Sequence, residues 1–367
     1  MRQPVGGVEV DFGAGPRRLA AGTVVLDLTP AGGLVPAEGP IDWTQLDKLP
    51  HCRTVEWSGP DRGVVDAVAG RLGIRFLYWS DAVGDLDLRR THLGTVRLNG
   101  AQLRSVRLPR LIETVLLLRP PAGLQVEAPN EGRRVALRLF QYGPDVVIPT
   151  GLRRAPEVWL WVGGEFSAAA LAALSDLEHL TLTFDAPPGV LTDLSQLRQH
   201  PRMHTLQLDD AYGLDPAALP ELPQLRHLVL NGTRRTIATT LRQRFRRGPV
   251  ELSVNGAKSQ AWLAAHMDNP FRDWVEDSKA FGQAACKAYT RAWRAIEAIE
   301  PEAPDRLTAA ERALRDLVAD LNTIDSEHGL IDTIYREQAW DVFLDLAKRL
   351  HIPEPQAGEW FNESRRF

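Results

Sequence analysis

The side chains best suited to chemistry form one recurring set of histidine and carboxylate positions. Glu157, His179, His227 and Glu251 each stand directly before a buried-type Leu or Val in a repeated apolar pattern, and Thr205 holds the same position between the two histidines. Imidazole and carboxylate groups ligate zinc and act as general acids or bases. If these residues lie on neighbouring strands about 4.8 Å apart, the histidines are about 10 Å from each other, too far to share one metal ion. The sequence therefore predicts no metal site and no catalytic residue.

Other patterns that bind cofactors are incomplete or absent from the sequence. Residues 322–337 contain the Gly-x-Ile-Asp core of an EF-hand calcium loop. Its ligand positions, however, fall on Ile324, Ser326, His328 and Tyr335, which do not provide the paired carboxylates and closing glutamate that such a loop needs. There is no P-loop, dinucleotide fingerprint, Gly-x-Ser-x-Gly elbow or Cys-x-x-Cys pair. We expect no cofactor.

A repeated apolar pattern positions the residues named above. Its strongest copies, at 177–182, 203–208 and 225–230, read Leu-x-x-Leu-x-Leu, with Met203 in place of one leucine. Weaker copies extend the pattern at intervals of about 20–26 residues, apart from a first gap of about 30. These copies begin at Thr23, Cys52, Gly73, Leu93, Ile112, Arg134, Ala155 and Pro249. In the copy that begins at Gly73, this frame places Phe76 and Tyr78 in the core.

The pattern resembles that of the leucine-rich-repeat family. Leucines two residues apart point to the same side of a strand, and stacked copies bury them in one continuous core. The resemblance implies an α/β fold: a solenoid with a parallel β-sheet on its concave face and a mixed helix and strand convex side, followed by a small all-α bundle. The asparagine that the family often places three residues after the motif is replaced, for example by Asp185, Ala211 and Thr233. We therefore assign the general architecture and no subclass.

The segments that return between copies differ along the chain. Residues 61–71, 166–175, 190–199 and 236–247 have helical patterns. Between about 84 and 150 the return segments instead alternate like short strands. These strand-like segments are Leu86–Leu88, Val106–Leu108, Leu124–Val126 and Val146–Ile148. We predict central coils backed by strands and flanking coils backed by helices.

The chain changes to helical periodicity after the last copy. We place the solenoid at 1–256, a linker or cap at 257–275 and a helical domain at 276–367. The expected helices cover 277–300, 307–322 and 331–350, with a short one after Pro353. Gly329 is the expected helix C-cap in a helix–turn–helix corner without a metal ion.

The segment from Asn269 to Phe367 resembles the helical tail of bacterial leucine-rich-repeat proteins. Many of these are actinobacterial, and some carry a gliding-motility label, which we do not adopt. The resemblance rests on Asn269-Pro-Phe-Arg-Asp-Trp274, Gly329-Leu-Ile-Asp-Thr-Ile334 and Trp360-Phe-x-Glu363. It implies an architecture and no activity.

Large apolar side chains recur at the solvent-facing positions of the middle copies. A patch of this kind is costly unless a partner covers it, and Trp is enriched in interface hot spots. Further along, the same positions become polar. We predict that the concave face binds a protein or peptide, possible partners being a toxin or modifying enzyme encoded nearby. The predicted binding residues are Leu77, Trp79, Arg97, Leu116, Arg138, Phe140, Trp159, Trp161, His179, Gln207, Asp209 and His227.

Three alternatives stay open at this point. The helical domain or an N-terminal segment covers the face, or the assumed strand register is wrong. An enzyme or enzyme subunit would use the polar end of the face or the junction with the helical domain, for which His227, Glu251 and Asp273 would have to cluster. A self-associating module is the third. The oligomeric state is not predicted.

The composition of the chain indicates which class of partner and which cellular compartment to expect. The 367 residues carry 43 basic and 47 acidic side chains, a balance that does not favour nucleic acid as the partner. Cys52 and Cys286 are far apart, so we expect buried thiols and no disulfide. No apolar stretch is long enough to cross a membrane and no signal peptide follows Met1. We expect a cytoplasmic protein.

Overall fold

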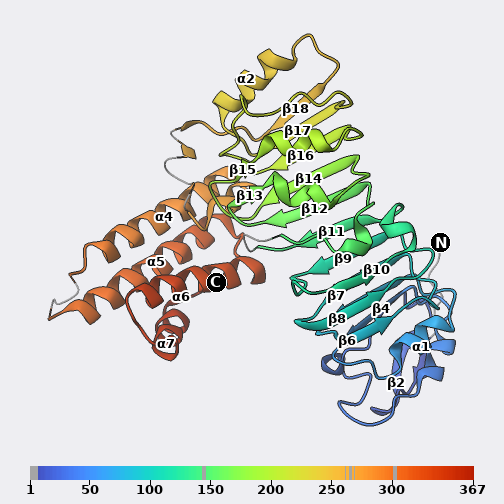
Figure 1. The fold of residues 1–367 in the computed structure, drawn as a ribbon. Coiled ribbons are helices and arrows are strands. Elements are labelled where there is room, and N and C mark those ends of the chain that lie inside the picture. Colours follow the sequence, from blue (N-terminus) through green and yellow to red (C-terminus); the bar gives the residue numbers. More distant parts are fainter. Residues whose placement is uncertain (1–6, 143–145, 261, 264–266, 268, 301–303) are drawn as a thin grey trace. The chain divides into compact units, whose positions relative to one another are not determined.

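The computed structural model describes residues 7–142, 146–260, 262–263, 267, 269–300 and 304–367. The chain divides into two compact units, Met1–Lys258 and Ser259–Phe367, which we describe separately. Figure 1 shows the first unit in blue to yellow and the second in orange to red.

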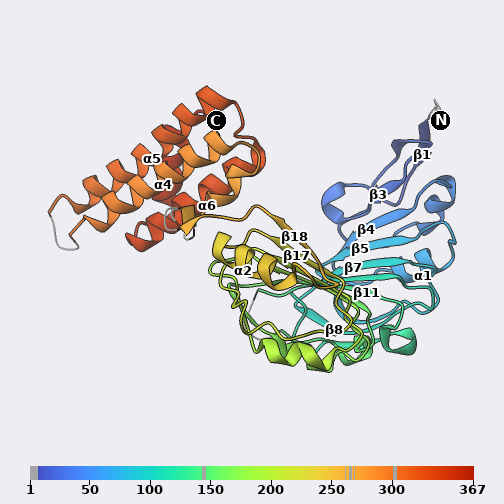
Figure 2. The same ribbon diagram turned by 90° about the horizontal axis from the view of Figure 1, so that it is seen from above.

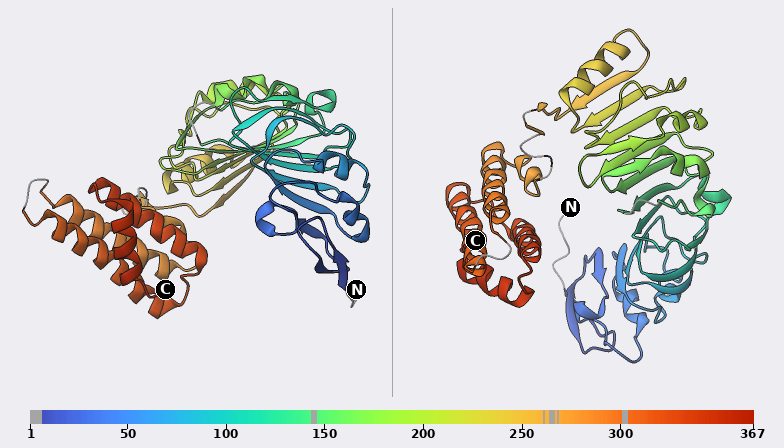
Figure 3. Two further views of the ribbon diagram at one scale, coloured as in Figure 1. Left: turned by 90° about the horizontal axis from the view of Figure 1, so that it is seen from below. Right: turned by 60° about the vertical axis from the view of Figure 1, so that its left-hand side comes forward.

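The first unit is built around one parallel sheet of eleven strands that follow each other in chain order. Each strand comes from one copy of the apolar pattern, so the predicted leucine-rich-repeat solenoid is confirmed. Figure 3 (right) shows its coils stacked along an arc. The strands are β3 (Val25–Asp27), β4 (Thr54–Ser58), β5 (Phe76–Ser80), β7 (Thr95–Asn99), β9 (Thr114–Leu118), β11 (Ala136–Phe140), β12 (Glu157–Val162), β14 (His179–Phe184), β16 (Thr205–Asp209), β17 (His227–Asn231) and β18 (Glu251–Asn255).

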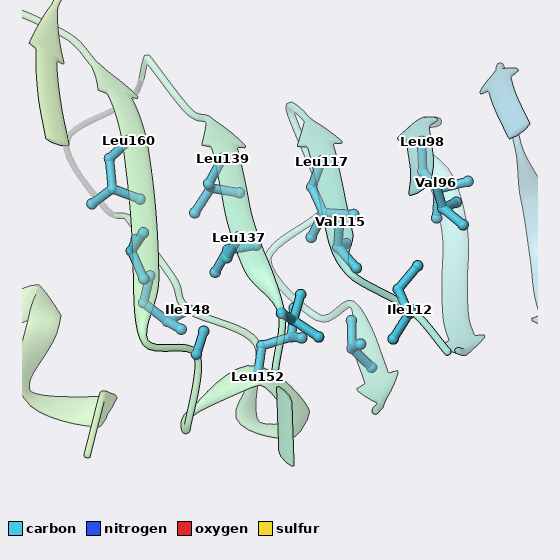
Figure 4. Close-up of a cluster of buried hydrophobic side chains, with 14 of the residues drawn as sticks. Val96, Leu98, Ile112, Val115, Leu117, Leu137, Leu139, Ile148, Leu152 and Leu160 are labelled. Atoms are coloured by element: carbon cyan, nitrogen blue, oxygen red, sulfur yellow. The ribbon is translucent and has the colours of Figure 1, made fainter. Parts of the chain in front are cut away.

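The repeated leucines pair with each other at fixed register and form the core. Leu117, Leu139 and Leu160 are direct neighbours on β9, β11 and β12, and each is at most 1% exposed. Figure 4 shows these side chains on the same side of the sheet, facing Ile148 and Leu152 from the return segments. Because side chains alternate along a strand, this register fixes which residues point away from the core.

One strand departs from the predicted register. In β5 the buried residues are Leu77 and Trp79, at 0% and 1% exposure, whereas Phe76 and Tyr78 point outward. The assignment of Leu77 and Trp79 to the binding face is therefore wrong. Trp79 is also held in the core by its indole nitrogen Nε1, which donates to the Gly59 carbonyl at 2.8 Å. A shift of one residue moves every side chain of a strand to the opposite face.

The return segments agree with the predicted division in most places. Three central ones, β6 (Val83–Asp87), β8 (Gln102–Arg107) and β10 (Gln125–Glu127), form a parallel sheet of their own. The fourth, Val146–Ile148, is buried at its first and last residues but is not a strand. Flanking coils return through α1 (Val64–Ala69), the 3₁₀ helices η5 (Ala168–Ala173) and η6 (Leu194–Gln199), and α2 (Arg235–Phe245). Short strands β13 (Glu165–Ser167) and β15 (Val190–Thr192) precede η5 and η6.

The two ends of the solenoid are closed differently. At the start, an antiparallel hairpin of β1 (Gly7–Val10) and β2 (Arg17–Ala20) contributes Val10 and Phe12 to the core. At the other end, α2 packs beside β18 (Figure 2). Further 3₁₀ turns are η1 (Pro30–Gly32), η2 (Trp43–Lys48), η3 (Pro129–Gly132) and η4 (Thr150–Leu152).

The second unit is a helical bundle with its own core. The short helix η7 (Arg272–Val275) places Phe271 and Trp274 in that core, and Trp274 Nε1 donates to Gln338 Oε1 at 2.6 Å. Gly329 ends α5 in the left-handed conformation, as predicted. Parts of the predicted linker, 261, 264–266 and 268, lie outside the described residues. The long helices are α4 (Lys279–Glu297), α5 (Arg306–His328), α6 (Thr333–Arg349) and α7 (Glu354–Ser364).

Two further findings concern the residues that the structure describes. Cys52 and Cys286 are buried free thiols. Among the described helices, none is both long and apolar enough to span a bilayer.

Candidate functional site

The candidate site is the outward face of the eleven-stranded sheet, which we call the sheet face. It consists of the strand side chains that point away from the leucine core. Every predicted binding residue except Leu77 and Trp79 lies there. Arg97, Leu116, Arg138, Trp159 and Gln207 share one register position, Phe140, Trp161 and Asp209 a second, and His179 and His227 a third.

Three aromatic residues on β11 and β12, which we call the aromatic cluster, occupy the middle of the face. Trp161 stacks on Phe140 of the neighbouring strand, with ring centroids 3.9 Å apart and planes at 10°. Its own strand neighbour Trp159 stacks on the other side, at 4.1 Å and 20°. All three side chains are half-buried. Their faces largely cover each other, so the cluster presents a fixed apolar surface built from ring edges.

A row of five side chains crosses the middle of the face at one register. In strand order from β5 to β12, the row reads Tyr78, Arg97, Leu116, Arg138 and Trp159. The Arg97 guanidinium lies 5.9 Å from the Tyr78 ring, and the Arg138 guanidinium lies 5.2 Å from the Trp159 ring. Each arginine thus packs against the aromatic ring on the side away from Leu116, and Leu116 lies between the two arginines.

Side chains on β14 to β18, which we call the polar network, bond to each other across the strands. The Asp209 carboxylate accepts from Thr183 Oγ1 at 3.1 Å, from Gln207 Nε2 at 3.0 Å and from Asn231 Nδ2 at 2.7 Å. Asn255 Nδ2 in turn donates to Asn231 Oδ1 at 2.9 Å. Much of the hydrogen-bonding capacity at this end of the face is therefore used within the protein.

One bond connects the two regions. Trp159 Nε1 donates to Thr183 Oγ1 at 3.1 Å, and the Thr183 hydroxyl then donates to Asp209. A hydrogen bond to the polar network therefore fixes the orientation of the Trp159 indole in the aromatic cluster.

The histidine column has the predicted spacing. Thr205 lies between His179 and His227, and only neighbouring members meet: His227 Nδ1 is 3.3 Å from Glu251 Oε2, and both of those side chains are exposed. Burial lowers the pKa of His179, while the Glu157 carboxylate opposes that shift. Asp273 belongs to the second unit, where it pairs with Arg272 at 3.3 Å. Among the described residues, no three His, Cys, Asp or Glu side chains are grouped to hold a metal ion.

A small pocket of about 130 Å³ opens near the N-terminal part of the row. Tyr78 and Arg97 line it together with Glu56, Asn99 and Leu118. Its outward-facing walls include Tyr78, which the sequence frame had placed in the core.

Comparisons with known proteins give only distant matches. No family model matches the sequence, and neither does any curated protein. A leucine-rich-repeat protein from Leptospira interrogans aligns with 65% of this chain and 74% of its own, at 13% identity and a TM-score of 0.33. An internalin from Listeria monocytogenes aligns with 60% of this chain and 72% of its own, at 12% identity and a TM-score of 0.29. The fold assignment rests on the parallel sheet and its register.

Sequence reasoning missed two parts of the site. Phe76 and Tyr78 were assigned to the core because four large apolar residues in a row, 76–79, carry no alternation that would reveal the register. The polar network was seen only as a column of polar residues. Repetition of Asp209, Asn231 and Asn255 at one register position was the signal that these side chains bond across strands.

Proposed function

We propose that this protein is a non-enzymatic interaction module that binds a protein or peptide partner through the sheet face. The observation that supports this most directly is the aromatic cluster, because three stacked rings are held on a strand surface instead of in the core. Half-exposed aromatic surface is costly in water and gains free energy when a partner covers it. Trp, Tyr and Arg, which make up most of the surrounding row, are the residues most enriched in binding hot spots.

The geometry of the cluster favours binding for a second reason. Trp161 is stacked on both faces, and Trp159 is fixed by its bond to Thr183. Side chains that are already ordered lose little conformational entropy when a partner arrives, which improves affinity.

The charges of the face favour a protein over a nucleic acid. The strands of the sheet place two cations on it, Arg97 and Arg138, against five carboxylates. A uniformly negative phosphate backbone would meet repulsion over most of this surface. The carboxylates are Asp27, Glu56, Glu157, Asp209 and Glu251.

The test is a pull-down from the native host with the wild-type chain and with Trp159→Ala/Trp161→Ala. We expect the double variant to lose a partner that the wild type retains. A protein encoded beside this one, such as a toxin or a modifying enzyme, is the first candidate to look for. Leu111→Ala is the matched control, since Leu111 is 55% exposed and lies outside the strands of the sheet. Circular dichroism checks that both proteins are folded. If the folded wild type and the folded double variant then retain identical sets of partners, the proposal is contradicted.

A further inference from the structure

We infer that the middle of the sheet face selects an extended peptide segment with two acidic side chains and an apolar side chain between them. The inference rests on the proposed function, because it assigns the chemistry of the partner to the same surface. It depends on the row Tyr78, Arg97, Leu116, Arg138 and Trp159.

The two arginines of this row lack an anionic partner. Within the described part of the chain, the Arg97 and Arg138 side chains contact an aromatic ring but neither a carboxylate nor a carbonyl. Arg138 Nε is buried and has no hydrogen-bond partner. Arg138 is half-buried, so a guanidinium without a partner is unfavourable there, whereas Arg97 is exposed to solvent. An anion supplied from outside would pair with each of the two guanidinium groups.

Arginines of the same solenoid that lie outside the sheet face behave differently. Arg104 Nη2 lies 2.6 Å from Asp85 Oδ2, and Arg154 Nε lies 2.9 Å from Asp176 Oδ2. Carboxylates elsewhere in the solenoid thus satisfy arginines within the chain. The sheet face instead places Leu116 between Arg97 and Arg138, where a carboxylate would neutralise both.

The spacing of the row specifies the ligand. Arg97 and Arg138 are two strands apart, which separates their backbones by about 10 Å. An extended peptide advances about 3.3 Å per residue and points alternate side chains to opposite faces, so acidic residues four positions apart face the sheet together, about 13 Å from each other. The long arginine side chains reach across the difference from about 10 Å, and the residue midway between the two acids then lies over Leu116 and Leu118. A planar carboxylate fits a guanidinium in a two-pronged arrangement, which favours carboxylates over a point charge.

The surroundings limit the acidic stretch to these two positions. Glu56 lies on one side of the row, beyond Tyr78, and Glu157 and Asp209 lie on the other. A third acidic residue at either end would meet like charge.

The experiment is a selection from a displayed library of random linear peptides, with the full-length protein as the target. It is run in parallel on the wild type, on Arg97→Gln/Arg138→Gln and on Trp159→Ala/Trp161→Ala. Arg110→Gln is the matched control, because Arg110 is exposed and outside the strands of the sheet. We expect wild type and Arg110→Gln to enrich peptides with two acidic residues around an apolar one, and the Arg97→Gln/Arg138→Gln variant to lose that enrichment.

A selected peptide is then titrated by fluorescence anisotropy. Each arginine-to-glutamine or acid-to-amide change should weaken binding about fivefold, and the two changes on one charge pair should not add. Added salt should weaken the wild-type complex.

The outcomes separate this inference from the proposed function. If peptides depend on Trp159 and Trp161 but carry no acidic pair, the inference is wrong and the interaction face stands. If the acidic pairs bind equally well without Arg97 and Arg138, the inference is likewise wrong. If no peptide distinguishes the wild type from the tryptophan variant, both are contradicted.

Discussion

The middle and the C-terminal end of the sheet face carry different kinds of outward-facing side chains, which interact with each other in different ways. In the middle, on β7 to β12, the outward positions hold mostly aromatic, aliphatic and cationic side chains, and among the described residues the guanidinium groups of Arg97 and Arg138 have no carboxylate partner. At the end, on β14 to β18, the outward positions hold polar side chains whose donors and acceptors are matched around Asp209. The difference teaches that an exposed polar column is not by itself a binding site. On the sheet face itself, the buried side-chain nitrogen without a hydrogen-bond partner, Arg138 Nε, lies in the region rich in aromatic residues.

The largest expected effect concerns binding. Truncating Trp161 to Ala should weaken partner binding about 30-fold or more, because it removes the central ring of the stack. Asn231→Ala should change the same affinity by less than about threefold, since its amide bonds within the protein. Isothermal titration with the captured partner measures both. Equal losses for the two variants would remove the distinction between the regions.

The next largest expected effect is on the free energy of unfolding, to which the polar network should contribute more than the middle of the face. Asp209→Ala leaves three donors without an acceptor and should lower the free energy of unfolding by about 1–2 kcal/mol. Leu118→Ala, on the half-buried middle of the face, should cost less than about 1 kcal/mol. Urea unfolding followed by circular dichroism gives both values. A larger loss for Leu118→Ala would indicate that the middle is structural.

A smaller effect is the dependence of stability on pH, which we expect only in the part of the solenoid that carries the polar network. Burial lowers the pKa of His179 on β14 and of His200, which precedes β16 and is 2% exposed. Residues 93–178, which include β9 to β12, contain no histidine. A histidine whose pKa is lowered by folding stabilises the fold above its unfolded value of about 6.5 and loses that contribution as the pH falls below it. One pH unit lower, the loss is at most about 1.4 kcal/mol per histidine.

Hydrogen exchange at pH 7.5 and 5.5, corrected for the intrinsic rates, locates this effect. We expect lower protection at acid pH in β14 and β16 but not in β9 to β12. His200→Leu should reduce the acid sensitivity, and His227→Ala, at an exposed position, should leave it unchanged. Uniform loss of protection along the sheet would argue against a local origin.

The smallest expected effect tests the outer end of the polar network. Asn255 is exposed and bonds only to Asn231 within the network, so Asn255→Ala should change the free energy of unfolding by no more than about 0.5 kcal/mol. The same urea titration measures it. A cost as large as that of Asp209→Ala would mean that the network stabilises the protein as one cooperative unit.

Much of the fold could be predicted because the repeat has a simple physical cause. Leucines two residues apart, as at 180 and 182 or 228 and 230, can be buried together only on one side of a strand, and the recurring copies stack. The N-terminal hairpin was missed because its short strands precede the repeat and bury few residues, among them Val10. The segments at 166–175 and 190–199, expected to be helical, instead form short strands followed by six-residue 3₁₀ helices.

The site was predicted in part. Alternation correctly placed Trp159, Trp161 and Phe140 outside the core, because each directly follows a buried aliphatic residue in a regular strand. It failed at 76–79, where apolar residues on both faces remove the alternation. Stacking of the rings and the hydrogen bonds around Asp209 depend on side-chain rotamers, which the pattern of residue types does not encode.

The most direct test of the central claim is photo-crosslinking from the aromatic cluster in living cells. A benzophenone amino acid at position 140, with position 111 as the control, is activated by light, and the products are purified under denaturing conditions and identified by mass spectrometry. We predict that position 140 crosslinks to one partner protein through a defined peptide, and that position 111 does not. A crosslink from position 140 into residues 259–367 of the same chain, with no partner captured, would contradict the account.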